Sequence, residues 1–208
     1  MNLLVTYAMP EEAPRCHLPS TCRQIVTGIG KVLAVSRVAR AVCEQRPDLI
    51  LSLGFCGGLN GTRQGDMVVP DRTRQWDLTL NDLDIPLGHG YAMHCPMSLP
   101  EVRFKTVPNP VRGLVITGDR FVDSSVHVDK HAVAVDMETA ALAVLAAELD
   151  IPLVCLREVS DVADGPQGMP HQQFMDYIRD KGPGYSDAVA ELIERGPLDL
   201  PPPRKEGA

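Results

Sequence analysis

Six carboxylates stand where apolar stretches of the sequence end. They follow three such stretches in pairs: Glu11 and Glu12, Asp136 and Glu138, and Asp161 and Asp164. Carboxylates gathered at one edge of a sheet can work as general acid and general base, because one group donates a proton while another removes one. A single carboxylate in such a place is more often a helix N-cap or a first-turn acid. Their recurrence at equivalent places in three strand–helix units favours a functional site.

Two glycine-rich turns also follow apolar stretches. Gly28-Ile29-Gly30-Lys31 opens a helical stretch, where backbone amides and the helix dipole favour an anion. This turn lacks the third glycine of a dinucleotide fingerprint and the hydroxyl residue of a P-loop, so a tight strand-to-helix turn is the simpler interpretation. Gly54-Phe55-Cys56-Gly57-Gly58 ends the stretch Leu49–Leu53. Glycines at the carboxyl end of a strand let a ligand approach the backbone closely.

Strands and helices are predicted to alternate along the chain. The apolar runs of strand length are Asn2–Ala8, Arg23–Thr27, Asp48–Leu53, Asp66–Pro70, Gly113–Thr117, His131–Val135 and Pro152–Glu158. Helical periodicity marks Val32–Val42 and Ala140–Ala147, and further helices are expected at Gln173–Asp180 and Ser186–Arg195. This alternation predicts an α/β sheet that is covered on both faces.

Two regions depart from that pattern. Residues 197–208 are rich in proline and are expected to form a disordered tail behind a single domain over residues 1–196. Periodicity also fades over Asp77–Val111, which is either a functional lid or interface element or a tolerated surface excursion. Trp76 and Phe104 fit an interface and fit an ordinary satellite core equally well.

Composition narrows the classes of protein. Twenty basic and 27 acidic residues among 208 give a net charge of −7, which argues against a nucleic-acid or anionic-membrane partner. The six cysteines form no C-x-x-C pair and are expected to be reduced, and His89, His94 and Cys95 lack the spacing of a metal site, so no metal is expected. Met1–Ala8 does not have the pattern of a signal peptide and no run of 18 apolar residues occurs, so a cytoplasmic location is expected.

Seven short strings occur in an order that is typical of one enzyme family. They are Tyr7-Ala8-Met9-Pro10-Glu11-Glu12, Gly28-Ile29-Gly30-Lys31-Val32, Gly54-Phe55-Cys56-Gly57-Gly58, Gly65-Asp66-Met67-Val68-Val69, Thr117-Gly118-Asp119-Arg120-Phe121-Val122, Val135-Asp136-Met137-Glu138 and Ser160-Asp161-Val162-Ala163-Asp164. From Met1 to about Arg195 the chain resembles the nucleoside phosphorylase superfamily, most closely its methylthioadenosine/S-adenosylhomocysteine nucleosidase branch. The resemblance implies a single-domain, three-layer α/β/α fold with a central mixed, twisted β-sheet, and no metal or organic cofactor.

The resemblance also implies roles for the acids. The family cleaves the bond between a purine and C1′ of ribose, through an oxocarbenium-like state. Asp161 would protonate N7 of the purine and bind its 6-amino edge, Glu12 would deprotonate the attacking water, and Glu138 would bind the ribose 2′ and 3′ hydroxyls. The remaining substrate-binding residues would be Met137 against the sugar, Phe121 stacked on the purine and the Val122 backbone at the ring edge, with Met9, Phe55 and Ser160 completing the set.

Water is the expected nucleophile. Phosphorolytic relatives place an arginine and a small hydroxyl residue where this sequence has Ser52 and Phe55, which cannot clamp an anion. A purine nucleosidase is therefore expected, acting on a 5′-substituted adenosine such as methylthioadenosine or adenosylhomocysteine, or on a related futalosine-type, deoxyadenosine or adenosylated hopanoid nucleoside. The alternatives are a purine nucleoside phosphorylase and a non-catalytic nucleoside-binding protein. The resemblance further implies a homodimer or larger oligomer. The sequence departs from the resemblance at Ala13–Ile25, a segment too short for the β-hairpin that nucleosidases usually carry there.

Overall fold

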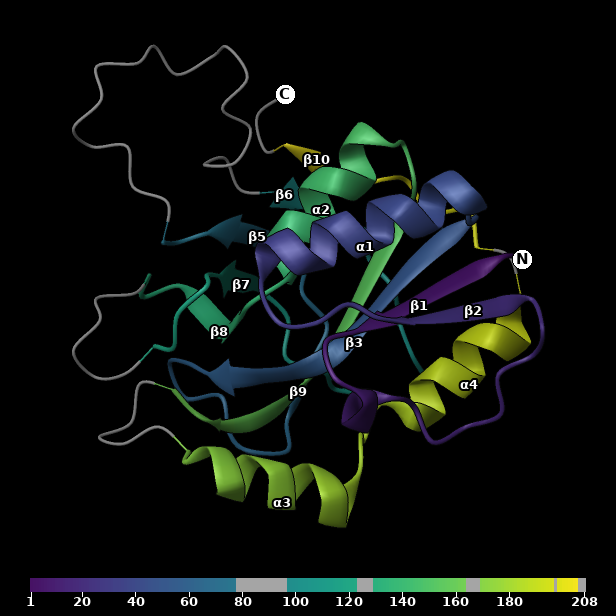
Figure 1. Ribbon diagram of the computed structural model, residues 1–208. Coiled ribbons are helices and arrows are strands. Elements are labelled where there is room, and N and C mark those ends of the chain that lie inside the picture. Colours follow the sequence, from purple (N-terminus) through teal and green to yellow (C-terminus); the bar gives the residue numbers. More distant parts are fainter. Residues whose placement is uncertain (78–96, 123–128, 164–168, 197, 206–208) are drawn as a thin grey trace, which may run out of the picture.

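The computed structural model describes residues 1–77, 97–122, 129–163, 169–196 and 198–205 (Figure 1). Its strands are β1 (Leu3–Tyr7), β2 (Cys22–Val26), β3 (Leu49–Gly58), β4 (Met67–Val68), β5 (Arg72–Gln75), β6 (Met97–Ser98), β7 (Leu114–Thr117), β8 (Ala132–Asp136), β9 (Leu153–Val162) and β10 (Arg204–Lys205). Its helices are the short 3₁₀ helix η1 (Pro10–Glu12), α1 (Lys31–Glu44), α2 (Thr139–Glu148), α3 (His171–Lys181) and α4 (Ser186–Arg195).

The strands form one mixed sheet, in the order β10-β6-β5-β7-β8-β3-β1-β2. Strand β3 is the hub, since it runs parallel to β1 and β9 and antiparallel to β8. Strand β9 leaves the main order and pairs with both β3 and β4. The predicted α/β fold with a central mixed sheet is therefore confirmed, and the carboxyl ends of β1, β3 and β9 point in the same direction.

Helices cover both faces of the sheet, α1 and α2 on one and α3 and α4 on the other (Figure 1). Alternation along the strands explains why both faces are apolar, because successive side chains point to opposite sides. In β1, Leu3 and Val5 pack in the cluster that contains Leu192 of α4, whereas Leu4 packs with Val38 of α1. The nearly continuous apolar strands in the sequence thus reflect burial on both faces.

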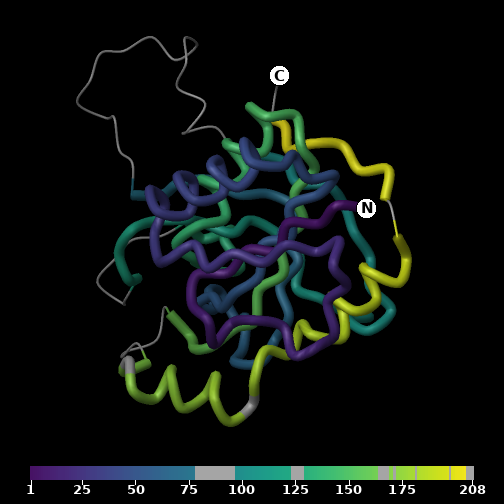
Figure 2. The backbone as a smooth tube through the Cα atoms, turned by 45° about the vertical axis from the view of Figure 1, so that its right-hand side comes forward, coloured from purple at the N-terminus to yellow at the C-terminus, as the bar shows by residue number. Residues whose placement is uncertain are grey.

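The C-terminal segment differs from its prediction. Residues 198–205 lie along the body of the protein, and Figure 2 shows this segment running from α4 around one side of the molecule. Leu198 and Leu200 pack against the core cluster beside α4, and Arg204 and Lys205 pair with β6 as the antiparallel strand β10. The expected disorder is wrong for these residues, because apolar side chains and a strand partner distant in sequence hold the segment in place.

The irregular region after β5 is partly core. Phe104 is 4% exposed and packs among the residues of the α4 side, and Trp76 is half-buried against a smaller apolar cluster around Ile116. The core interpretation of these two aromatic residues is therefore the one that the structure supports. Residues 78–96 of this region lie outside the described residues, as do His89, His94 and Cys95.

Candidate functional site

Glu12 is a buried acid that backbone amides hold in place. It ends η1 immediately after β1, and the residue is only 5% exposed. Its Oε2 accepts hydrogen bonds from the N–H groups of Ala8 at 2.7 Å and Met9 at 2.9 Å, and its Oε1 lies 3.4 Å from the N–H of Phe55 on β3. Burial raises the pKa of Glu12, while these N–H groups and the nearby Arg157 oppose the rise. A carboxylate with a raised pKa is a better proton acceptor near neutral pH.

Close packing fixes the Glu12 carboxylate against β3. A Cβ atom at Gly54 would lie 3.3 Å from Oε1 of Glu12. That contact is tighter than ordinary van der Waals packing, so a side chain there would push the carboxylate away. The glycine at the end of Leu49–Leu53 therefore makes room for an acid of this chain, in addition to any ligand.

Asp161 lies near the end of β9, next to a β-bulge. The register with β3 changes there, because Cys56 pairs with Val159 but Gly57 pairs with Asp161. Bulges of this kind redirect side chains and are common beside active sites. The Ser160 hydroxyl lies 2.6 Å from Oδ1 of Asp161 and 3.2 Å from the Cys56 carbonyl oxygen. The N–H of Met169 donates to Oδ2 of Asp161 at 3.4 Å.

The same strand anchors both acids. Glu12 contacts β3 at Gly54 and Phe55, and Asp161 pairs with β3 at Gly57. Two to three strand residues correspond to roughly 7–10 Å. The two acids are therefore anchored to neighbouring places along one strand.

Glu138 is the third acid, and its carboxylate binds the backbone of the first glycine turn. It lies at the start of α2, and its Oε1 accepts the N–H of Gly30 at 2.8 Å. Burial and the neighbouring Asp136 raise the pKa of Glu138 to about 8, and Glu12 adds to the rise. Gly30 has φ of +94°, and a Cβ there would meet Oδ1 of Asp119 at 3.0 Å. The turn needs glycine because two carboxylates of this chain approach its backbone.

Carboxylates of this chain already bind the backbone N–H groups and the lysine at the amino end of α1. The N–H of Lys31 donates to Oδ1 of Asp119 at 2.8 Å, and its ammonium group pairs with Asp77 at 2.6 Å and Asp119 at 3.6 Å. With Glu138 on Gly30, the amides that could hold a phosphate are bound to carboxylates. The prediction that this turn is structural agrees with these contacts.

Sequence reasoning missed Arg157, which is a buried cation on β9. The side chain is 1% exposed, and its Nε lies 2.9 Å from Oδ2 of the buried Asp136. Its guanidinium N–H groups donate to Asp136 Oδ2, the Ser52 and Leu156 carbonyl oxygens, the Ser52 hydroxyl and the Thr139 hydroxyl. All five guanidinium donors are therefore engaged within the protein. The signal in the sequence is a pair of charges, Arg157 and Glu158, inside an apolar strand.

Asp136 is a buried structural residue whose carboxylate is engaged by groups of this chain. Besides Arg157, its carboxylate accepts the Thr117 hydroxyl at 2.6 Å and bonds to the N–H and hydroxyl of Thr139. Glu11 is exposed, and Asp164 lies outside the described residues. Of the other strand-end acids, Glu12 and Asp161 lie along β3, and Glu138 follows β8, which pairs with β3.

Phe55 holds a cluster of aromatic side chains. Its ring is 8% exposed and packs edge-on against Phe174 and Tyr177 of α3, with ring centroids 5.8 and 6.1 Å away, and at a tilt against Tyr185 at 6.2 Å. The hydroxyl of Tyr185 donates to the carbonyl oxygen of Glu12 at 2.7 Å. The backbone of Phe55 thus faces Glu12, while its ring faces α3 and Tyr185.

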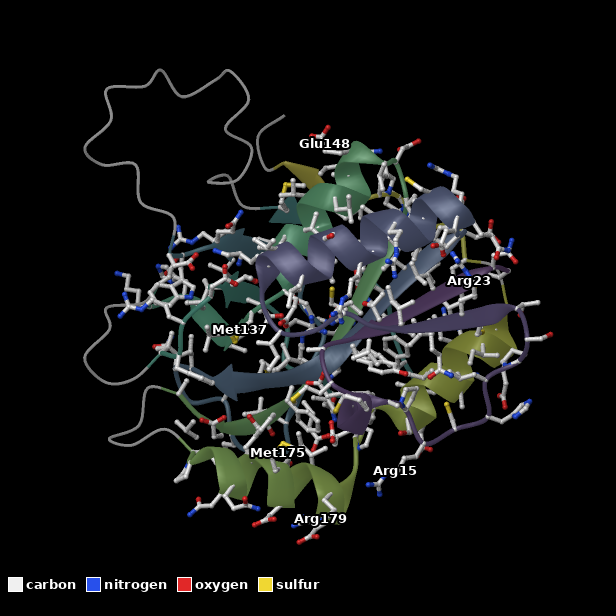
Figure 3. All side chains as sticks on the ribbon, viewed as in Figure 1. Arg15, Arg23, Met137, Glu148, Met175 and Arg179 are labelled. Carbon is white, nitrogen blue, oxygen red and sulfur yellow. The ribbon has the colours of Figure 1, made fainter. Side chains whose placement is uncertain are left out.

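The other predicted binding residues differ in how far they are buried. Met9 precedes η1 and Met137 precedes Glu138, and both are half-buried. Figure 3 labels Met137. Val122 is buried in the cluster around Ile116, whereas Phe121 is 89% exposed after β7. In the described ranges, no three His, Cys, Asp or Glu side chains are placed to hold a metal ion. No helix within those ranges is long and apolar enough to cross a bilayer.

Comparison with known proteins identifies the family. The family model described as Phosphorylase superfamily matches residues 22–195. The chain belongs to the phosphorylase superfamily. The matched part of this superfamily member contains β3, Glu138, Arg157 and Asp161, and it begins after Glu12.

Solved structures of three bacterial enzymes share the fold of this superfamily member. A methylthioadenosine/S-adenosylhomocysteine nucleosidase from Neisseria meningitidis, in complex with methylthio-immucillin-A, is 23% identical; the match covers 93% of this chain and 98% of that one, with a TM-score of 0.74. The corresponding Streptococcus pneumoniae enzyme, with a transition-state inhibitor, is 21% identical over 93% and 99%, with a TM-score of 0.73. An S-adenosylhomocysteine nucleosidase from Streptococcus pyogenes, in complex with 5-methylthiotubericidin, is 22% identical over 94% and 97%, with a TM-score of 0.73.

Proposed function

We propose that this protein is a purine nucleosidase that hydrolyses the N-glycosidic bond of a 5′-substituted adenosine. The observation that carries the proposal is the anchoring of Glu12 and Asp161 to β3 within two to three residues of each other. Solved relatives that share the fold are named as methylthioadenosine/S-adenosylhomocysteine nucleosidases, which supports the choice of substrate class.

In the proposed reaction, the two acids act on opposite sides of C1′. Asp161 protonates N7 of the purine, so the base leaves as a neutral molecule, and Glu12 removes a proton from the water that attacks C1′. Glu138 binds the ribose hydroxyls, with Met137 and Met9 against the sugar. Phe121 and the Val122 backbone bind the purine, and the Ser160 hydroxyl orients Asp161. The products are the free base and the ribose moiety, and no metal or cofactor takes part.

Water is favoured over phosphate by the contacts of the local cations. All five Arg157 donors bind groups within the protein, and the Lys31 ammonium is paired with Asp77. The backbone N–H groups of Gly30 and Lys31 bind Glu138 and Asp119. A phosphate dianion entering here would meet carboxylates in place of donors. Glu12, by contrast, is a buried proton acceptor suited to water.

We also propose a homodimer in the cytoplasm. Exposed apolar side chains stand at the start of α1, beside the glycine turn that binds Glu138: Ile29 is 52%, Val32 is 77% and Leu33 is 44% exposed. Burial of such a patch against a second copy is favourable. Sedimentation analysis of the unsubstituted protein and of Val32→Asp tests this, because the variant should shift toward the monomer.

Release of the free base tests the activity. The protein is incubated with methylthioadenosine, adenosylhomocysteine, 5′-deoxyadenosine, adenosine and inosine, with and without phosphate. Release of adenine without phosphate is the expected result. Release only with phosphate would establish a phosphorylase. Binding of a nucleoside without release of base would establish a binding protein.

A further inference from the structure

A second buried acid, Glu158, lies beside the proposed site. It is on β9, and the residue is 5% exposed. Its register partner on β3 is Phe55, and it immediately follows Arg157. Since neighbouring side chains of a strand point to opposite faces, Arg157 points toward α2 and Glu158 points toward α3. Neither the proposed chemistry nor the buried ion pair uses this carboxylate.

Both oxygens of Glu158 bind one segment of the chain. The Tyr177 hydroxyl on α3 donates to Oε1 at 2.7 Å, and the N–H of Gly184, in the turn before α4, donates to Oε2 at 2.6 Å. Burial and the neighbouring carboxylate raise the pKa of Tyr177, so this hydroxyl stays protonated and remains a donor. A buried carboxylate that accepts two short hydrogen bonds makes a strong tether.

The tethered segment, residues 169–185, contacts both proposed catalytic acids. At its start, the N–H of Met169 donates to Asp161. At its end, the Tyr185 hydroxyl donates to the Glu12 carbonyl oxygen. Between these contacts, Phe174 and Tyr177 pack on Phe55, whose N–H faces Glu12. Figure 3 shows Met175 of α3 on the side of the sheet and Arg179 on the outer side.

The β-bulge places Glu158 and Asp161 on the same face of the sheet. The extra residue between Val159 and Asp161 reverses the alternation of β9, so Asp161 lies on the same face as Glu158. Glu158 and Asp161 therefore both face the segment 169–185. One carboxylate holds this segment in place, and the two ends of the segment contact the two acids.

We propose that Glu158 is a positioning residue: by fixing residues 169–185 on the sheet, it sets the relative places of Glu12 and Asp161. This inference rests on the proposed nucleosidase function. Glu158 binds Tyr177 and Gly184, so its loss should lower kcat by misplacing the acids and should leave KM nearly unchanged. A misplacement of about 1 Å is worth up to roughly 100-fold in rate.

The test uses Glu158→Gln, Tyr177→Phe and the double variant. Glu158→Gln should lower kcat for base release by about 10–100-fold, with KM within about twofold of the unsubstituted protein. Tyr177→Phe should lower kcat less, and the double variant should be no worse than Glu158→Gln, since the two groups act through one contact. If Glu158→Gln does not fold, Tyr177→Phe still carries the test.

Glu191→Gln is the matched control. Glu191 of α4 also tethers a segment, since it accepts the N–H of Lys105 and both the N–H and the hydroxyl of Thr106, each at 2.9 Å. That segment contacts neither Glu12 nor Asp161 in any of these hydrogen bonds. Loss of the Glu191 carboxylate should leave kcat unchanged, even if the melting temperature of the protein falls.

Hydrogen exchange separates this inference from the function on which it rests. Peptides that cover residues 8–13 and 169–185 should exchange faster in Glu158→Gln than in Glu191→Gln. Unchanged exchange in these peptides, an unchanged kcat, or independent losses in the double variant would overturn the role of Glu158. Faster exchange in a protein that releases no base from any nucleoside would refute the nucleosidase function and leave the tether intact.

Discussion

Replacement of Glu12 by glutamine is the most direct perturbation of the proposed reaction. Two N–H donors, those of Ala8 and Met9, point at Oε2, and one N–H, that of Phe55, points at Oε1. The amide oxygen of glutamine should keep the first pair, because an NH₂ group there would face two donors. The NH₂ group then replaces Oε1, where it can neither accept the N–H of Phe55 nor take a proton from water.

The expected loss follows from that change of one acceptor into a donor. General-base action is worth about 10²–10⁴-fold in rate, or about 2.7–5.4 kcal/mol in the activation barrier. The folded state should tolerate the variant, since a neutral amide avoids the cost of burying a charge whose pKa is already raised. We expect kcat for release of adenine to fall at least 100-fold, with cooperative thermal unfolding retained.

Glu11→Gln is the control for this experiment. It removes the same charge from the neighbouring residue, which is exposed, and it should keep full activity. If Glu12→Gln releases base within about tenfold of the unsubstituted rate, Glu12 is not the base and the chemistry must be reassigned.

Three further perturbations follow from the structure. Asp161→Asn should cost at least about 100-fold in kcat with the fold intact, and a variant with full turnover would remove Asp161 from the mechanism. Arg157→Met should lower the free energy of unfolding in urea by about 3–5 kcal/mol, since it leaves Asp136 buried without its cation, whereas the exposed Arg40→Met should change it by less than about 1 kcal/mol. Equal changes in the free energy of unfolding for Arg157→Met and Arg40→Met would contradict the ion pair between Arg157 and Asp136. The pKa of Glu138 is about 8 in the folded protein and near 4.5 when unfolded, so the folded state binds the proton more tightly and stability falls as pH rises between these values. Glu138→Gln removes this pH-dependent fall in stability. The free energy of unfolding of the variant, relative to that of the unsubstituted protein, should therefore rise by up to about 1.4 kcal/mol per pH unit over that range. A difference that does not change with pH, measured by urea unfolding, would show that the pKa of Glu138 is not raised.

The sequence predicted the sheet because its signals are local. Apolar runs such as Asn2–Ala8 and Asp48–Leu53 are buried on both faces, and their composition shows this without knowledge of their neighbours. The short strands β5 and β6 were missed, since Arg72–Gln75 is polar and Met97–Ser98 has two residues. The tail was mispredicted for a related reason: its proline content suggests disorder, whereas its order comes from Met97 and Ser98, a hundred residues earlier.

The candidate site was predictable as a set of acids and not as a network. Glu12, Glu138 and Asp161 could be selected because each follows a strand in a recognisable string. Arg157 and Glu158 were hidden inside a run interpreted only as a strand, and their partners Asp136, Tyr177 and Gly184 lie 19–26 residues away. The contact of Asp119 with the amino end of α1 spans 88 residues. Interactions of this range depend on the fold and have no local pattern.

The bulge in β9 makes the relative lengths of β3 and β9 as important as their composition. Insertion of one residue between Cys56 and Gly57 of β3 would give Ser160 a partner and restore a regular ladder. Asp161 would then turn to the side of the sheet on which Arg157 lies, away from α3, although the sequence would still contain every acid. A single-codon insertion in a neighbouring strand can thus separate the two acids without replacing either of them, and homologues should be aligned here by strand register as well as by matching letters.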